Sequence, residues 1–102
     1  MKEEQLIKNL IKEGRGEQLE FLEVVQNKEV AKVICSFLNT NGGVLVIGVK
    51  DGVIKGIRDA EKMIGELNCF LLDEIIPEVP INISIEKLGY INFIIVKVYK
   101  GS

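Results

Sequence analysis

Residues 33–57, VICSFLNTNGGVLVIGVKDGVIKGI, form the most informative stretch of this chain. They begin with apolar residues at helical spacing and reach NTNGG at 39–43, where glycine permits the positive φ that a helix end requires. Residues 44–49 are apolar almost throughout, which predicts a central strand covered on both faces. The tripeptide KDG at 50–52 is typical of a tight turn, so we expect residues 53–57 to return as the second strand of a hairpin.

The segments on both sides of this stretch alternate between strand and helix patterns. Residues 18–25 predict a strand, and residues 90–99 predict a second central strand. Residues 81–86 alternate isoleucine with polar residues, as in a half-exposed strand near an edge. Asp59 is a suitable N-cap for a helix that ends before Pro77. The earlier helix has an apolar face formed by Val30, Val33, Ile34, Phe37 and Leu38.

An amphipathic helix is predicted ahead of these elements. Its apolar face consists of Leu6, Ile7, Leu10 and Ile11. A helix of three turns needs a surface to pack against, either in its own domain or on a second chain. We therefore divide the chain into an N-terminal helix at 1–13 and a single domain at 14–102. The predicted order is α-β-α-β-β-α-β-β, a two-layer α+β fold with helices packed on a mixed β-sheet.

The composition excludes several classes of protein. Apolar residues make up 47% of the 102 residues, which indicates one globular domain. The formal charge is −2, from 15 acidic and 13 basic residues, so any nucleic-acid site must be a local patch rather than a generally basic surface. No apolar run reaches the roughly 18 residues of a membrane span, and the N-terminus lacks a signal-peptide core. We therefore expect a cytoplasmic protein with no membrane partner.

Two cysteines and the absence of histidine limit the possible chemistry. Cys35 and Cys69 lie within apolar helical patterns and are expected to be reduced, buried thiols. The chain has too few soft ligands for a zinc site. Without histidine, neither a Ser-His-Asp nor a Cys-His nucleophile is possible.

The paired glycines Gly42 and Gly43 do not match a phosphate-binding loop. Such a loop follows a strand and precedes a helix, so that free N–H groups face the anion. Here the helix comes first and presents its carbonyl end. We expect these glycines to end the helix and to allow close backbone packing.

Three carboxylates, Glu17, Glu20 and Asp51, fall near strand ends that a sheet would bring together. Converging carboxylates suit Mg²⁺ or Mn²⁺, which prefer oxygen ligands and assist phosphodiester cleavage. Surface glutamates are common, however, and aspartate is favoured in turns for conformational reasons. The spacing therefore leaves both a metal site and ordinary surface positions open.

Basic residues gather around the predicted hairpin, where acidic residues interrupt them. They form either a solvated surface or a patch that contacts phosphates. The candidate phosphate contacts are Lys50, Lys55, Arg58 and Lys62, with Lys28 and Lys32 one helical turn apart on the preceding helix.

Tyr90 and Tyr99 lie at the two ends of the last apolar strand. Aromatic rings of this kind can stack on bases. Because their strand is apolar, we expect both rings to pack against the sheet instead.

These motifs together resemble the Schlafen-type AlbA domain, which is associated with DNA binding. The similarity covers about residues 14–101. It is carried by GEQLEF at 16–21, ICSFLNTNGG at 34–43, VLVIGVKDG at 44–52, IKGI at 54–57, IP at 76–77 and VKVY at 96–99. The same family occurs in proteins described as RecG-related helicases, divergent AAA proteins and transcriptional regulators.

The sequence departs from the family pattern at two places. Leu22 replaces the lysine that follows Glu-Phe, which removes one cation. Schlafen proteins that resemble RNA endonucleases use two strand carboxylates five residues apart and one hairpin aspartate. Glu20 and Asp51 occupy two of these positions, whereas Arg15 occupies the third and Glu17 lies two residues away.

The resemblance implies a nucleic-acid-binding domain with DNA or RNA as its partner and no cofactor, which is our leading hypothesis. One alternative is a metal-dependent endoribonuclease in which Glu17, Glu20 and Asp51 hold Mg²⁺ or Mn²⁺. The other is a protein-interaction module that forms homo-oligomers through the N-terminal helix.

Overall fold

The computed structural model describes residues 18–74 and 81–99, which contain two helices and a mixed set of strands. The predicted order from the first strand onward is confirmed in outline, with three strands instead of two between the helices. The predicted helix at 1–13 lies outside the described residues. The elements are β1 (Leu19–Leu22), α2 (Asn27–Leu38), β2 (Gly43–Ile47), β3 (Val49–Lys50), β4 (Val53–Ile54), α3 (Ala60–Glu74), β5 (Ile81–Leu88) and β6 (Ile91–Val98).

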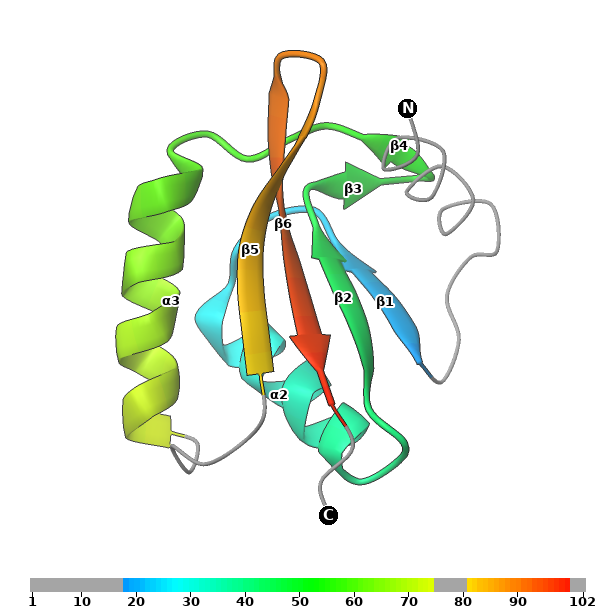
Figure 1. Ribbon diagram of the computed structural model, residues 1–102, viewed down its shortest axis with the longest axis vertical. Helices are drawn as coiled ribbons and strands as arrows, with labels where there is room; N and C mark the ends of the chain where they lie inside the picture. The colour runs from blue at the N-terminus through cyan, green and yellow to red at the C-terminus, as the bar shows by residue number, and fades with distance from the viewer. Residues whose placement is uncertain (1–17, 75–80, 100–102) are drawn as a thin grey trace.

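Four strands form the main sheet in the order β1-β2-β6-β5 (Figure 1). β1 and β2 are parallel and are joined through α2, whereas β2 pairs with β6, and β6 with β5, in antiparallel fashion. The sheet is therefore mixed, as predicted. β2 and β6 are central, and β5 is the half-exposed edge strand that its alternating isoleucines predict.

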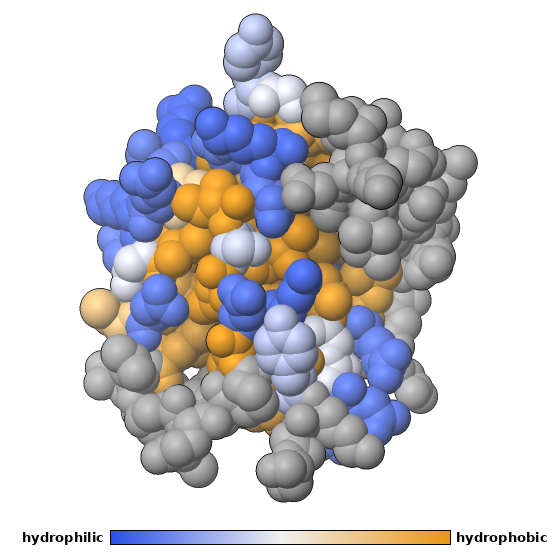
Figure 2. Space-filling model, viewed as in Figure 1, coloured by the Kyte–Doolittle hydropathy of each residue, from blue (hydrophilic) through white to orange (hydrophobic). Residues whose placement is uncertain are grey.

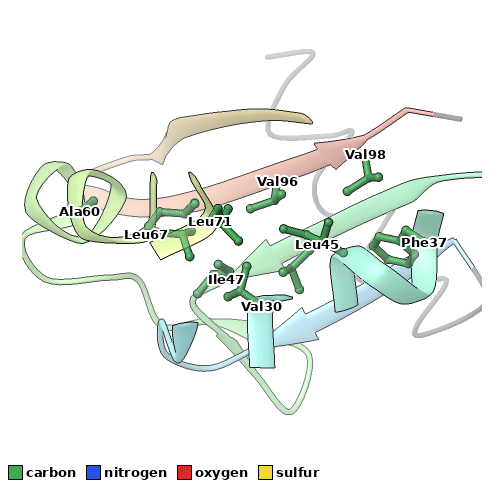
Figure 3. Close-up of a cluster of buried hydrophobic side chains, with 11 residues drawn as sticks. Val30, Phe37, Leu45, Ile47, Ala60, Leu67, Leu71, Val96 and Val98 are labelled. Carbon is green, nitrogen blue, oxygen red and sulfur yellow. The ribbon is translucent and has the colours of Figure 1, made fainter. Parts of the chain in front are cut away.

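Both helices pack on one face of this sheet, which confirms the two-layer α+β architecture. Side chains alternate between the faces of a strand, and Leu45, Ile94 and Val96 point to the helix side. They meet Val30 and Leu67 from the two helices in a continuous apolar cluster (Figure 3). Its full membership is Val30, Ile34, Phe37, Leu45, Ile47, Ala60, Leu67, Leu71, Ile94, Val96 and Val98.

The short β3–β4 hairpin covers part of the opposite face. Its Val49 and Ile54 pack with Phe21, Val46 and Phe93, which are the side chains that alternate away from the helices. This second cluster explains why β2 and β6 are apolar on both faces. Within the part of the chain that the structure describes, no polar or charged residue belongs to the buried core.

The glycine pair at 42–43 ends α2, as predicted. Gly42 has a φ of +84°, and its N–H donates to the Phe37 carbonyl over 2.9 Å. Gly43 is required for packing, because a Cβ there would lie 2.7 Å from the Phe37 ring atoms Cδ1 and Cε1. The two glycines are therefore part of the architecture and have no phosphate-loop geometry.

Gly48 divides the single strand that we predicted at 44–49. Its φ is +112°, a value that side-chain-bearing residues rarely adopt, so the chain turns out of the main sheet there. The Gly48 carbonyl then accepts hydrogen bonds from the N–H groups of Lys55 and Gly56, at 2.7 and 3.0 Å. As a result, β3 and β4 form a separate two-stranded sheet.

The prediction that both cysteines are buried is wrong. Cys35 on α2 and Cys69 on α3 are both exposed thiols. The buried positions of α2 are Val30, Ile34 and Phe37, and Cys35 follows Ile34 by one residue. One residue corresponds to about 100° around an α-helix, so an apolar residue type at that position does not place the side chain in the core.

Neither α2 nor α3 combines the length and the apolar composition that a membrane span requires.

The contact between Gly43 and Phe37 can be tested by substitution. We expect Gly43→Ala to lower the free energy of unfolding by about 1–3 kcal/mol, because Phe37 is buried and the added methyl group overpacks it. Gly65→Ala is the matched control. A Cβ there meets no atom within 4 Å. Alanine in the interior of α3 should therefore raise the free energy of unfolding by about 0.5–1 kcal/mol. Urea unfolding measures both changes, and a Gly43→Ala protein as stable as the parent would contradict this packing.

Candidate functional site

The β3–β4 hairpin and the residues after it form one end of the molecule, at the top of Figure 1. Lys50 pairs with Val53, which leaves Asp51 and Gly52 as a two-residue loop. Both loop residues have positive φ, +52° and +77°, as a type I′ turn requires. Asp-Gly is a favoured pair for this turn, so the turn alone accounts for an aspartate at position 51.

Residues 55–58 then cross beside β6 on the way to α3. The Ile57 N–H donates to the Asn92 carbonyl over 2.7 Å. A Cβ on Gly56 would lie 2.5 Å from Cγ2 of Ile91, so the crossing backbone lies directly against β6. This contact joins residues 50–62 to residues 87–91 at the β5–β6 tip, and we call the two segments together the upper edge.

The upper edge contains four of the six predicted cations. Lys50, Lys55, Arg58 and Lys62 are all exposed, and hydrophilic side chains gather at this end of the surface in Figure 2. Lys50 is partly neutralised, because its Nζ lies 3.8 Å from Oε2 of Glu23. Among the described residues, none forms an ion pair with the other three cations of this group.

Lys28 and Lys32 occupy a different place. They lie on α2, which runs behind the sheet in Figure 1, away from the β3–β4 hairpin. Both are exposed, and Lys32 lies 3.5 Å from Glu29 one turn earlier. The structure therefore separates the six predicted cations into an upper-edge group and an α2 pair.

The three candidate metal ligands are only partly described. Glu17 lies outside the described residues. Glu20 is half-buried in β1, where its Oε1 accepts the Phe21 N–H at 3.0 Å. Asp51 is exposed at the hairpin tip. Within residues 18–74 and 81–99, no three acidic or cysteine side chains gather closely enough to hold a metal ion. The proposed metal site of Glu17, Glu20 and Asp51 remains a prediction.

A surface hollow of about 500 Å³ lies between the end of β1 and the β3–β4 hairpin. Asp51 lines it, and the β1 side contributes Glu23 rather than Glu20. The hollow has both signs of charge, since the Lys50–Glu23 pair lies on its wall. Its remaining lining residues are Phe21, Leu22, Val49 and Gly52.

Two upper-edge residues were missed or misplaced by sequence reasoning. Lys87, exposed near the end of β5, is not among the cations that the sequence predicted as phosphate contacts. Tyr90 was expected to pack against the sheet, but its exposed fraction is 104%. Tyr99 is also exposed, at 50%. Both expectations were wrong because β6 begins at Ile91 and ends at Val98. The two rings therefore lie just outside the strand that was expected to bury them.

Comparison with known proteins agrees with this architecture. Residues 16–102 match the sequence family described as "Schlafen, AlbA_2". Among solved structures, the chain is similar to the N-terminal domain of a Nitrosomonas europaea protein described as related to the ATP-dependent DNA helicase RecG. The TM-score is 0.65 at 17% sequence identity, covering 94% of this chain and 74% of the other. At that identity, the similarity establishes the fold.

The conformation of Asp51 predicts how its substitutions affect stability. We expect Asp51→Asn to change the free energy of unfolding by less than about 0.5 kcal/mol, because asparagine tolerates the left-handed conformation. Asp51→Ala should lower the free energy of unfolding by about 1 kcal/mol, since alanine is strained in the left-handed conformation. Urea unfolding distinguishes the two variants, and equal stability would contradict the positive φ at this position.

Proposed function

The chain belongs to the Schlafen AlbA_2 family, and from that premise we propose that it is a nucleic-acid-binding domain whose main phosphate contacts lie on the upper edge. The observation that carries the proposal is the group of exposed cations Lys55, Arg58 and Lys62, none of which forms an ion pair within the described residues. The similar N-terminal domain comes from a protein whose description refers to a DNA helicase, which is consistent with a role on DNA.

The arrangement of these cations suits phosphate binding. Lys55 and Arg58 extend from a backbone segment that hydrogen bonds to Gly48 and Asn92 fix in place, so both side chains start from defined positions. Phosphate contacts of this kind position a nucleic acid without reading its sequence. With a net charge of −2, the chain has no general attraction for polyanions. We therefore infer that binding depends on this local group and weakens with salt.

A metal-dependent ribonuclease is the second candidate. The observation that favours it is the surface hollow, which is lined both by Asp51 and by Phe21, the residue that follows Glu20 in β1. Mg²⁺ or Mn²⁺ held by Glu20, Asp51 and Glu17 would supply Lewis-acid assistance to phosphodiester cleavage. The carboxylate oxygens are the donor type that these ions prefer.

We expect Lys55→Gln/Arg58→Gln to weaken binding to short DNA and RNA and to reduce the slope of log K against log salt by about 1.5, because two phosphate contacts are lost. Lys28→Gln/Lys32→Gln is the matched control, with the same change in net charge on α2. Fluorescence anisotropy with labelled oligonucleotides at several salt concentrations measures both. An equal loss in the two variants would assign the effect to total charge instead of the upper edge. The absence of binding by the parent chain would refute the proposal.

For the ribonuclease candidate, we expect cleavage of a structured RNA in Mg²⁺ or Mn²⁺ that falls roughly 100-fold in Asp51→Asn, because one metal ligand is removed. This variant keeps the hairpin conformation, because asparagine tolerates the left-handed φ at position 51. Asp59→Asn is the matched control, since Asp59 is also exposed and has a φ of +55°. Cleavage that is equal in the two variants, or absent in the parent, would exclude this candidate.

A further inference from the structure

The tip of the β5–β6 hairpin presents one aromatic ring to solvent. Leu88 pairs with Ile91, so Gly89 and Tyr90 form a two-residue loop. Gly89 has a φ of +65°, whereas Tyr90 is not among the residues with positive φ. Glycine with positive φ at the first loop position is typical of a type II′ turn. This tight turn fixes the Tyr90 backbone at the end of the hairpin.

Neither packing nor the turn requires a tyrosine at position 90. An exposed fraction of 104% means that no part of the ring packs on the protein. Loop tips in hairpins favour glycine, asparagine and aspartate, which satisfy the turn without exposing apolar surface. Here the neighbouring Ile91 is also 38% exposed, so the apolar character of the tip extends beyond one side chain.

Cations lie on the same edge of the molecule as this ring. Lys87 belongs to the same hairpin. The Ile57–Asn92 hydrogen bond places the Lys55–Arg58 segment two residues below Tyr90 along β6, about 7 Å at the rise of a strand. Figure 1 shows the tip projecting beyond that crossing segment. The upper edge also includes the exposed acidic residues Asp51, Asp59 and Glu61. Glu86 precedes Lys87, but it pairs with Phe93 and lies on the opposite face of the sheet.

We propose that Tyr90 stacks on an unpaired base of single-stranded DNA or RNA while Lys55, Arg58 and Lys87 contact the neighbouring phosphates. This inference rests on the proposed function and specifies which form of nucleic acid is bound. An exposed ring beside a group of cations provides both elements of single-strand recognition, a stacking platform and phosphate contacts. In a duplex the bases are already stacked and paired, so the ring would have no free face to contact.

The aromatic composition of the chain allows a direct test. It contains two tyrosines and no tryptophan. In the Tyr99→Phe variant, Tyr90 is the one remaining tyrosine, so tyrosine fluorescence reports on that ring alone. We expect single-stranded oligo(dT) and oligo(U) to quench this fluorescence through stacking. An abasic oligomer of the same length keeps the phosphates but has no bases, so it should bind without quenching. A preference between dT and U would identify DNA or RNA as the source of the base.

Substitution then measures the contribution of stacking to affinity. We expect Tyr90→Ser to weaken single-strand binding about tenfold and Tyr90→Phe to change it less than about twofold. Tyr99→Ser, at the opposite end of β6, should have no effect. Tyr90 is fully exposed, so circular dichroism and thermal unfolding should show that Tyr90→Ser folds as the parent does.

The possible results separate this inference from the proposed function. Oligonucleotide binding that persists without quenching, or that Tyr90→Ser leaves unchanged, would overturn the stacking role and retain the phosphate contacts. Absence of binding to all oligonucleotides would overturn both. Binding to phosphatidylcholine–phosphatidylserine vesicles that Tyr90→Ser abolishes, without base-dependent quenching, would assign the tip to a membrane surface and overturn the inference.

Discussion

The Gly48 N–H donates to the Leu22 carbonyl over 2.7 Å, and the Gly48 carbonyl accepts from Lys55 and Gly56. These bonds hold the chain at the point where it leaves the main sheet, at a φ of +112°. A Cβ at this position would lie 3.2–3.3 Å from Phe93, Gly56 and Ile57, so a side chain would meet both strain and crowding. The covering hairpin, the crossing segment and the placement of the cations all depend on this bend.

The proposed interface follows from that bend because it joins segments that are distant in sequence. Once the chain has turned away at Gly48, β6 continues beyond the end of β2, and Ile57 bonds to its free edge at Asn92. The cations therefore stand on well-supported backbone, and their side chains are exposed to solvent. A surface of this kind recognises a flexible polyanion through contacts along an edge, without an enclosed ligand cavity.

The order of strands and helices could be predicted because apolar periodicity and turn residues act locally. NTNGG marked the end of α2, and the alternating isoleucines identified β5 as an edge strand. The bend at Gly48 could not be predicted, because its apolar neighbours continue the strand pattern and the residues that leave no room for a Cβ there, Phe93 and Ile57, are elsewhere in the sequence. Exposure was the least predictable property: Cys35 and Tyr90 have apolar neighbours in sequence, yet helix rotation and a strand end place them in solvent. Lys87 likewise has no signal in the sequence, because only the pairing of β5 with β6 brings it to the upper edge.

The pairing register of β2 and β6 also has a consequence for how the chain folds. β5 and β6 are joined by a two-residue loop, so their pairing is local and closes at little entropic cost. The partners of β2 in β6, such as Ile47 and Ile94, are about fifty positions apart in the sequence. Loop-closure entropy opposes such distant pairing until burial compensates it. The centre of the sheet, whose side chains are among the most deeply buried of the described residues, is therefore built on the least local strand pairing.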